Sequence, residues 1–326
     1  MKIGSTLLFV CCCLAAEVAL TDALIDRDNG PLTGLFGFPD SREGSTLADA
    51  GDGIWGFYVT ASSHSTRDAD GGESILFDGE TRRLALNYRR GFSERLELGV
   101  EIPWVSHESG SLDGFIDRWH SVFGLPDGIR HERPKDQLLF SYEDNGRQFS
   151  LTSNSRGAGD VRLIGGWRLT QSPQSSSALR FSVKLPTGDS GRLRGSGSTD
   201  VSLGIAGDGR QLMGIEKLSG FYRTSATWLG TPDFDARRTR RIVGQVSAGI
   251  GYDLTMRSTL ALQLLLRSPV YDSEISPLGD VAASLTMGVR VRLPREYTVS
   301  FAVGEDIHPG SMPDVTLALS LQKRQR

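Results

Sequence analysis

Twelve stretches of the chain alternate apolar and polar side chains, and this period of two constrains the fold more than any other feature. Successive side chains of a β-strand point to opposite faces, so each stretch predicts a strand with one apolar and one polar face. The apolar positions lie within Trp55–Ala61, Leu84–Tyr88, Leu96–Trp104, Val161–Leu169, Leu179–Leu185, Val201–Ile205, Tyr222–Trp228, Ile242–Tyr252, Leu260–Leu266, Val281–Leu293, Tyr297–Val303 and Val315–Leu321. Strands that cross a membrane show this pattern over about 9–11 residues.

Charged residues occupy the polar positions of nearly every stretch, and hydrophobic residues make up only 38% of the chain. A soluble β-sandwich or propeller is the alternative, but a barrel lumen solvates one whole face of the sheet more uniformly. Connections after even-numbered stretches are mostly short, and those after odd-numbered stretches are longer. Bacterial barrels combine short periplasmic turns with longer outer loops in this way. We therefore predict an all-β fold, a transmembrane antiparallel β-barrel of about 12 strands over residues 53–326.

Residues 1–23 resemble a secretory signal peptide, because Lys2 precedes an apolar stretch from Ile3 to Ala16 that is followed by small residues. The stretch is too short for a transmembrane helix, which needs about 20 apolar residues. Cleavage after Ala23 is the preferred site, and Ala16 and Ala19 are alternatives. All three cysteines lie inside this stretch, so the mature chain is expected to have no thiol chemistry. Export predicts the outer membrane of a Gram-negative bacterium as the location.

Residues 24–52 precede the first predicted strand and are rich in glycine and proline. In a barrel protein, this segment must lie in the periplasm or fold into the lumen. The sequence leaves both a periplasmic leader and a luminal plug open.

The connection between the third and fourth stretches contains an apolar stripe at helical spacing, and Gly124 with Pro126 would end the helix. The residues of this expected loop helix are Leu112, Phe115, Ile116, Trp119, His120 and Phe123. A helix in a long extracellular loop could act as a gate or could only rigidify the rim. Residues 137–142 and 147–152 further predict a hairpin, because Asn145-Gly146 favours a tight primed turn.

Charged residues at the polar strand positions are expected to line the lumen. They are Arg83, Arg89, Arg95, Glu97, Glu101, Arg162, Arg168, Arg180 and Lys184. Their interleaved signs fit either a polar pathway with mild anion preference or ion pairs that stabilise the wall. A separate cluster near the outer end of the eighth stretch could bind lipopolysaccharide phosphate or be solvated. It consists of Arg237, Arg238, Arg240 and Arg241.

The sequence predicts no cofactor, no metal and no nucleic-acid partner, because the net charge is −3 and no zinc or phosphate-binding motif occurs. A lipid hydrolase is considered because some outer-membrane barrels of twelve strands are phospholipases. The near candidates for its histidine and serine are His107-Glu-Ser109 and His64-Ser65, and neither forms a nucleophile elbow. We therefore do not expect an enzyme.

Several short segments are more specific than the alternation. They are Gly34–Pro39, Phe77–Arg82, Glu101–Trp104, Leu112–His120, Phe123–Pro126, Gly159–Val161, Lys184–Asp189 and Gly195–Asp200. Together, and in this order, they resemble an uncharacterised proteobacterial family of outer-membrane β-barrels, catalogued as a domain of unknown function. The resemblance spans essentially the whole mature chain and implies location and architecture but no known activity. The C-terminus departs from the usual barrel ending, because Gln322–Arg326 stands where a terminal aromatic residue is expected.

Fold-level analogy favours passive passage of an unknown small-molecule solute through the barrel. The alternative is a non-transporting barrel that acts in envelope integrity or binds lipid, and a lipid hydrolase is the third hypothesis. The expected partners are outer-membrane lipid and lipopolysaccharide, the barrel assembly machinery and the solute itself.

Overall fold

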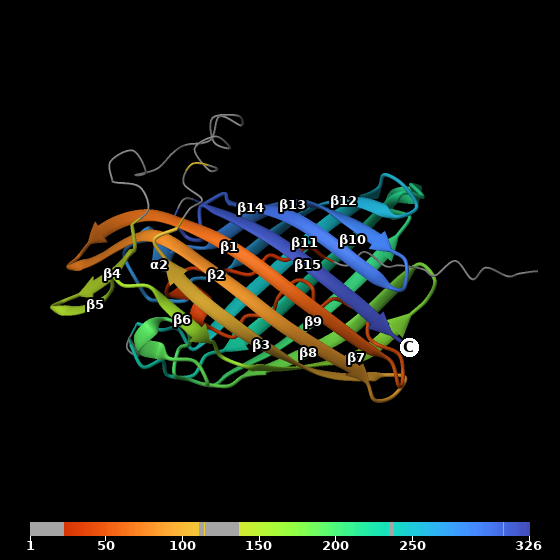
Figure 1. The fold of residues 1–326 in the computed structure, drawn as a ribbon, viewed down its shortest axis with the longest axis horizontal. Helices are drawn as coiled ribbons and strands as arrows, with labels where there is room; N and C mark the ends of the chain where they lie inside the picture. The colour runs from red at the N-terminus through yellow and green to blue at the C-terminus, as the bar shows by residue number, and fades with distance from the viewer. Residues whose placement is uncertain (1–22, 111–113, 115–136, 235–237, 309) are drawn as a thin grey trace, which may run out of the picture.

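The sheet closes on itself, because β1 (Gly53–Asp70) pairs with β2 (Glu73–Gly91) on one side and with β15 (Val315–Gln325) on the other (Figure 1). The structure is a computed structural model that describes residues 23–110, 114, 137–234, 238–308 and 310–326. Within these residues, twelve strands form the closed antiparallel ring. Between β2 and β15 they are β3 (Leu96–Glu108), β7 (Arg162–Gln171), β8 (Ser175–Lys184), β9 (Asp200–Arg210), β10 (Leu218–Trp228), β11 (Ile242–Asp253), β12 (Ser258–Arg267), β13 (Ala282–Leu293) and β14 (Tyr297–Asp306).

Each of the twelve predicted stretches corresponds to one strand of this ring, so the predicted barrel of about 12 strands is confirmed. The alternation of burial explains the match. On β9, for example, Ser202 is 2% exposed and its neighbour Leu203 is 60% exposed. The same contrast recurs around the ring and leaves a belt of apolar side chains on the outer surface. A belt of this extent marks a surface that faces an apolar environment.

The two ends of the barrel differ. At one end, here called the short-turn end, brief turns follow β2, β7, β9, β11 and β13. At the other, the long-loop end, β1 and β2 stay paired as far as Asp70 and Glu73 and project beyond their neighbours (Figure 1). A hairpin of β4 (Leu139–Asp144) and β5 (Arg147–Leu151) adds to the projecting part of β2, and β6 (Ser155–Ala158) pairs with β3. Asn145 and Gly146 both have positive φ, so the predicted hairpin turn is confirmed.

The helices whose bounds lie within the described residues are short and occur in connections or in the segment before β1. They are η1 (Thr33–Leu35), η3 (Ser190–Arg192), η4 (Leu212–Gly214) and α2 (Ser276–Gly279). No helix among the described residues has the length and mean hydropathy of a membrane span. The predicted loop helix cannot be compared, because Leu112, Phe115, Ile116, Trp119, His120 and Phe123 lie outside the described residues.

An apolar core fills the long-loop end. It joins residues near η1 to the β4–β5 hairpin and to the loops after β8, β10 and β12. Phe36 and Phe140 are fully buried in it, and the Phe36 ring meets Tyr271 edge-on at 6.2 Å. Among the described residues, the loops after β8, β10 and β12 therefore pack on residues 32–38 and on the β4–β5 hairpin.

Candidate functional site in the lumen

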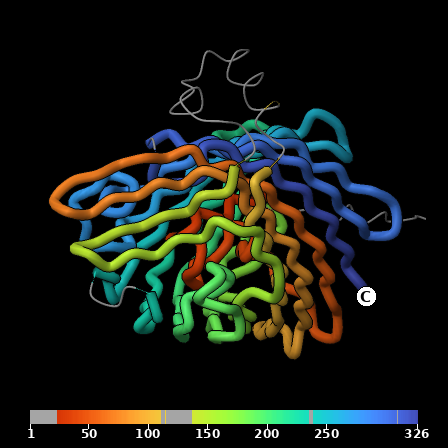
Figure 2. Tube along the Cα trace, turned by 60° about the vertical axis from the view of Figure 1, so that its left-hand side comes forward, coloured from red at the N-terminus to blue at the C-terminus, as the bar shows by residue number. Residues whose placement is uncertain are grey.

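Residues 24–52, the luminal segment, lie inside the ring of strands as far as Ala48, and residues 49–51 are exposed just before β1 (Figure 2). The backbone of Leu24 exchanges two hydrogen bonds with the Gln263 side chain of β12, and the chain then reaches η1 at the long-loop end. It returns past Gln245, whose amide donates to Pro39, and Ala50 forms a bridge with Gly91 just before β1. The sequence leaves a periplasmic and a luminal position open, and the structure places the segment in the lumen.

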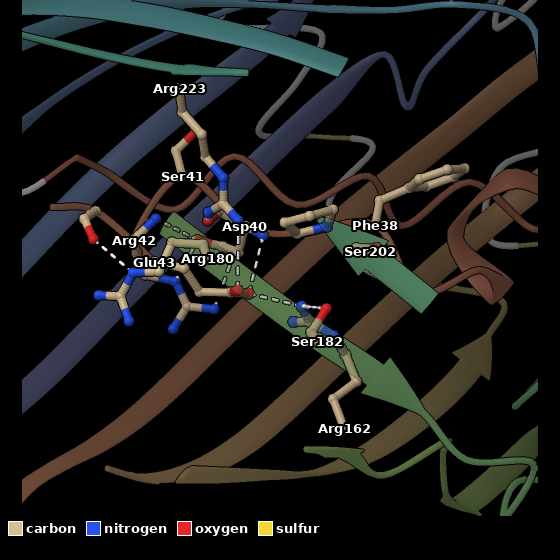
Figure 3. Close-up of polar contacts among 12 residues, drawn as sticks. Phe38, Asp40, Ser41, Arg42, Glu43, Arg162, Arg180, Ser182, Ser202 and Arg223 are labelled. Atoms are coloured by element: carbon tan, nitrogen blue, oxygen red, sulfur yellow. Dashed lines mark hydrogen bonds and ion pairs between the residues drawn. The ribbon is translucent and has the colours of Figure 1, made fainter. Parts of the chain in front are cut away.

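Glu43 lies at the centre of the contacts between segment and wall (Figure 3). One carboxylate oxygen accepts a hydrogen bond from Arg162 of β7 at 2.6 Å, and the other lies 3.4 Å from Arg223 of β10. Arg223 also donates to the carbonyl of Asp40. The Arg162 side chain is only 1% exposed, so this pair is shielded from solvent and from salt.

Glu101 of β3 forms a second centre beside the first. It lies 2.9 Å from Arg83, 3.7 Å from Arg162 and 3.6 Å from Arg42 of the segment. The Arg42 guanidinium also stacks on the Tyr58 ring at 3.5 Å. Four charges, from β2, β3, β7 and the segment, are thus held in one buried network.

A third group fixes the segment near the long-loop end. Lys184 donates to Asp160 at 2.6 Å and lies 3.3 Å from Asp200. Asp200 in turn accepts from the backbone N–H of Gly37 at 2.8 Å. A Cβ atom on Gly37 would lie 2.8 Å from the Lys184 Cβ, so this approach needs glycine. On the far side, Arg267 of β12 pairs with Asp28.

The short-turn end is held by a fourth group. Glu97 accepts from the backbone N–H of Ala48 at 2.6 Å and pairs with Arg180 at 2.7 Å. Arg168 of β7 pairs with Asp49 at 2.9 Å. The segment is therefore attached along its whole length by ion pairs and hydrogen bonds, and its apolar contacts lie around residues 32–38 and at Leu24 and Ile25.

Most of the charges expected in the lumen lie on the interior face of the ring. Those residues are Arg83, Arg89, Glu97, Glu101, Arg162, Arg168, Arg180 and Lys184. Arg95 is different, because β3 begins at Leu96 and leaves Arg95 exposed in the turn after β2. The sequence analysis does not name Arg223 and Arg267 among the lumen charges. Both occupy polar positions in the alternation of their strands, so the same pattern could have identified them.

The predicted arginine cluster is divided. Arg237 lies outside the described residues. Arg238 pairs with Asp144 of β4 at 2.9 Å and with Glu73 of β2 at 3.3 Å. Hydrogen bonds to Asp144, followed by the charge of Glu73, raise the pKa of Arg238. Arg238 thus joins the β4–β5 hairpin to β2, whereas Arg240 and Arg241 are the more solvent-accessible members of the cluster.

His64 and His107, the near candidates for a hydrolase histidine, are both buried inside the barrel, at 4% and 2% exposure. The Thr81 hydroxyl lies between them, 2.9 Å from His64 Nε2 and 3.1 Å from His107 Nδ1. His107 Nε2 lies 2.7 Å from the carbonyl of Leu193 and donates to it. The described residues contain no group of three or more His, Cys, Asp or Glu side chains placed to hold a metal ion.

Small cavities remain between the segment and the wall. The one between Arg27, Arg83, His107 and Lys184 has a volume of about 30 Å³. Another, bordered by Asp26 and Gln245, has about 10 Å³. Spaces of this size admit water but no organic solute, so a solute could pass at these two places only if the segment moved.

The fold resembles that of a crystallised COG4313 outer membrane channel from Pseudomonas putida F1, with a TM-score of 0.55 and 13% identity. The match covers 86% of this chain and 97% of that one. The KdgM porin is more distant, with a TM-score of 0.43, 10% identity and coverage of 83% and 98%. No curated protein matches the chain. A family described as "Protein of unknown function (DUF3187)" matches residues 7–325, and the chain therefore belongs to that family.

Proposed function

We propose that the protein is a passive channel for small molecules in the outer membrane of a Gram-negative bacterium, and that the luminal segment is its gate. Cleavage of residues 1–23 as an export signal is part of this proposal. The outer apolar belt and the likeness to an outer-membrane channel fold support the location. The short-turn end would then face the periplasm and the long-loop end the outside.

The polar contacts of residues 40–45 with the wall are the observation on which the gate depends. A solute path lined by polar side chains can be re-solvated when the segment leaves, because water replaces the lost hydrogen bonds. An apolar seat would instead favour permanent burial. Arg162, Arg180 and Arg223 are charged groups that water can solvate, so a closed and an open state can be close in free energy.

The dense packing of the lumen favours the second candidate, a non-transporting barrel that acts in envelope integrity. Buried ion pairs connect the segment to β3, β7, β10 and β12, and the cavities described above are small. In that case the segment would be a permanent core. Binding of lipopolysaccharide phosphate by Arg240 and Arg241, and gating by the predicted loop helix, stay proposals as well.

Substitution of Gly37 by alanine tests whether the segment is a gate. The added methyl group would lie 2.8 Å from Lys184 Cβ and 3.1 Å from Asp200 Cβ, so it must push the segment away from the wall. Overpacking of this kind costs about 1 kcal/mol or more, and the open fraction should rise by roughly fivefold or more. Single-channel recording in planar bilayers measures this fraction.

Gly44→Ala is the matched control, because the nearest atom to its added Cβ is the Asp208 carboxylate oxygen at 4.0 Å. It should conduct like the parent protein. If Gly37→Ala and the parent show the same absence of current while both give a heat-modifiable band on gels, the segment is a permanent core and the second candidate is favoured.

A further inference from the structure

The luminal segment and the wall carry opposite net charges. Residues 24–52 contain six acidic and two basic residues, hence a net charge of −4. Outside the projecting residues 64–82, the ring strands bury more basic than acidic side chains. The basic ones are Arg83, Arg89, Arg162, Arg180, Lys184, Arg223, Arg267 and Arg290, and the acidic ones are Glu97, Glu101, Asp200 and Asp208. Asp160, just before β7, adds a fifth acid, so the segment neutralises a wall that is basic by itself.

The carboxylates of the segment are held in the way that a protein holds a small anion. Glu43 lies between two guanidinium groups that come from strands separated by β8 and β9. Asp28 is held by Arg267 from a third direction. Charge-assisted bonds from arginine to a carboxylate are among the strongest and most geometrically specific that a protein makes. The three arginines are only 1–3% exposed at their side chains.

These arginines also have donor capacity that the segment does not use. The Nε atoms of Arg162, Arg223 and Arg267 donate to no acceptor among the described residues. Buried donors without acceptors are costly in a folded protein. One carboxylate for two guanidinium groups leaves this capacity open, whereas a ligand with two carboxylates brings twice the acceptors.

We propose that the luminal segment mimics the solute, and that Arg162 and Arg223 form a binding site for small organic anions with two or more carboxylates. The inference rests on the proposed channel and names its substrate class. When the segment leaves, its carboxylates leave with it, and the basic wall is exposed to the pathway. A dicarboxylate then takes the position of Glu43 between Arg162 and Arg223, while a neutral solute of equal size finds no partner for the guanidinium groups.

The test uses the full protein and Glu43→Gln, each reconstituted in planar bilayers after a heat-modifiable band has confirmed folding. The variant removes the central carboxylate of the mimic and keeps its shape. We expect a larger open fraction than in the parent and a reversal potential in a KCl gradient that shows preference for chloride. Added succinate should reduce the chloride current, and succinamide, its neutral counterpart, should not.

Arg162 and Arg223 are then replaced by glutamine in the Glu43→Gln background. Loss of a charged hydrogen bond should raise the succinate concentration needed for half block on the order of tenfold per arginine. Arg257→Gln, in an exposed turn after β11, is the matched control and should leave the block unchanged. Equal block by inorganic phosphate and succinate would overturn the carboxylate assignment in favour of a general anion site.

Different results would contradict the solute mimic and the channel itself. A conducting Glu43→Gln channel that prefers potassium, or that succinamide blocks as well as succinate does, overturns the solute mimic and leaves the channel intact. If folded Glu43→Gln and folded Gly37→Ala both carry no current, the channel itself is wrong, and the mimic is overturned with it.

Discussion

A chain that lacks residues 24–50, with the export signal left in place, is expected to conduct ions steadily in planar bilayers where the parent protein opens rarely. A minor open state is populated at about 0.1–10% in proteins of this kind, so the mean current should rise on the order of tenfold or more. The physical reason is that the lumen loses its occupant together with the ion pairs of Arg162, Arg223 and Arg267.

Two controls make the deletion interpretable. A chain in which residues 24–50 are replaced by a glycine-serine linker of equal length keeps the connection to β1 but loses the contacts. It should behave like the deletion. A folded deletion barrel with the same low current as the parent would show that the apolar core of the long-loop end closes the path without the segment.

Replacement of Arg162 by glutamine is expected to lower the free energy of unfolding by about 3–5 kcal/mol, because it leaves Glu43 and Glu101 buried without their shared cation. Arg162 lies 2.6 Å from Glu43 and 3.7 Å from Glu101. Urea titration of the refolded barrel in lipid vesicles, followed by tryptophan fluorescence, measures the change.

The double variant Arg162→Gln with Glu43→Gln separates a lost ion pair from a general packing defect. It removes both charges of the pair, so it should recover part of the stability that the single variant loses. Arg257→Gln, exposed in its turn, should stay within about 0.5 kcal/mol of the parent. Equal stability of Arg162→Gln and the parent would show that Glu43 and Glu101 are solvated and that the network is not buried.

The ring was predictable because its signal is local. A strand with one face in an apolar medium and one in a polar lumen repeats every two residues, and Leu260 to Leu266 display this without any knowledge of partners. The same alternation predicts that the side chains of Arg162 and Lys184 point into the lumen. The error at Arg95 has a local cause too, since strand ends are the least certain part of a periodic pattern. β3 begins one residue later, and the side chain falls in the turn.

The network itself was not predictable, because each of its contacts joins residues far apart in the sequence. Glu43 contacts Arg162 and Arg223, each more than a hundred residues away in the sequence, and no periodic sequence pattern indicates these contacts. The segment shows neither helical nor strand alternation, so its path depends on the wall around it. Its six acidic residues against two arginines were the available signal. This excess becomes informative only when the basic residues at the lumen-facing positions of the strands are counted as well.

The attachment of the luminal segment to β1 has a consequence for how such a channel would respond to its solute. Residue 52 is followed directly by the strand that closes the ring, so a displaced segment stays tethered at the mouth. A short tether holds its blocker at an effective concentration of roughly millimolar. A free solute would compete with the tethered segment for the same wall residues. The pore would therefore open only when the solute concentration outside approaches this effective concentration, and it would stay closed at much lower concentrations.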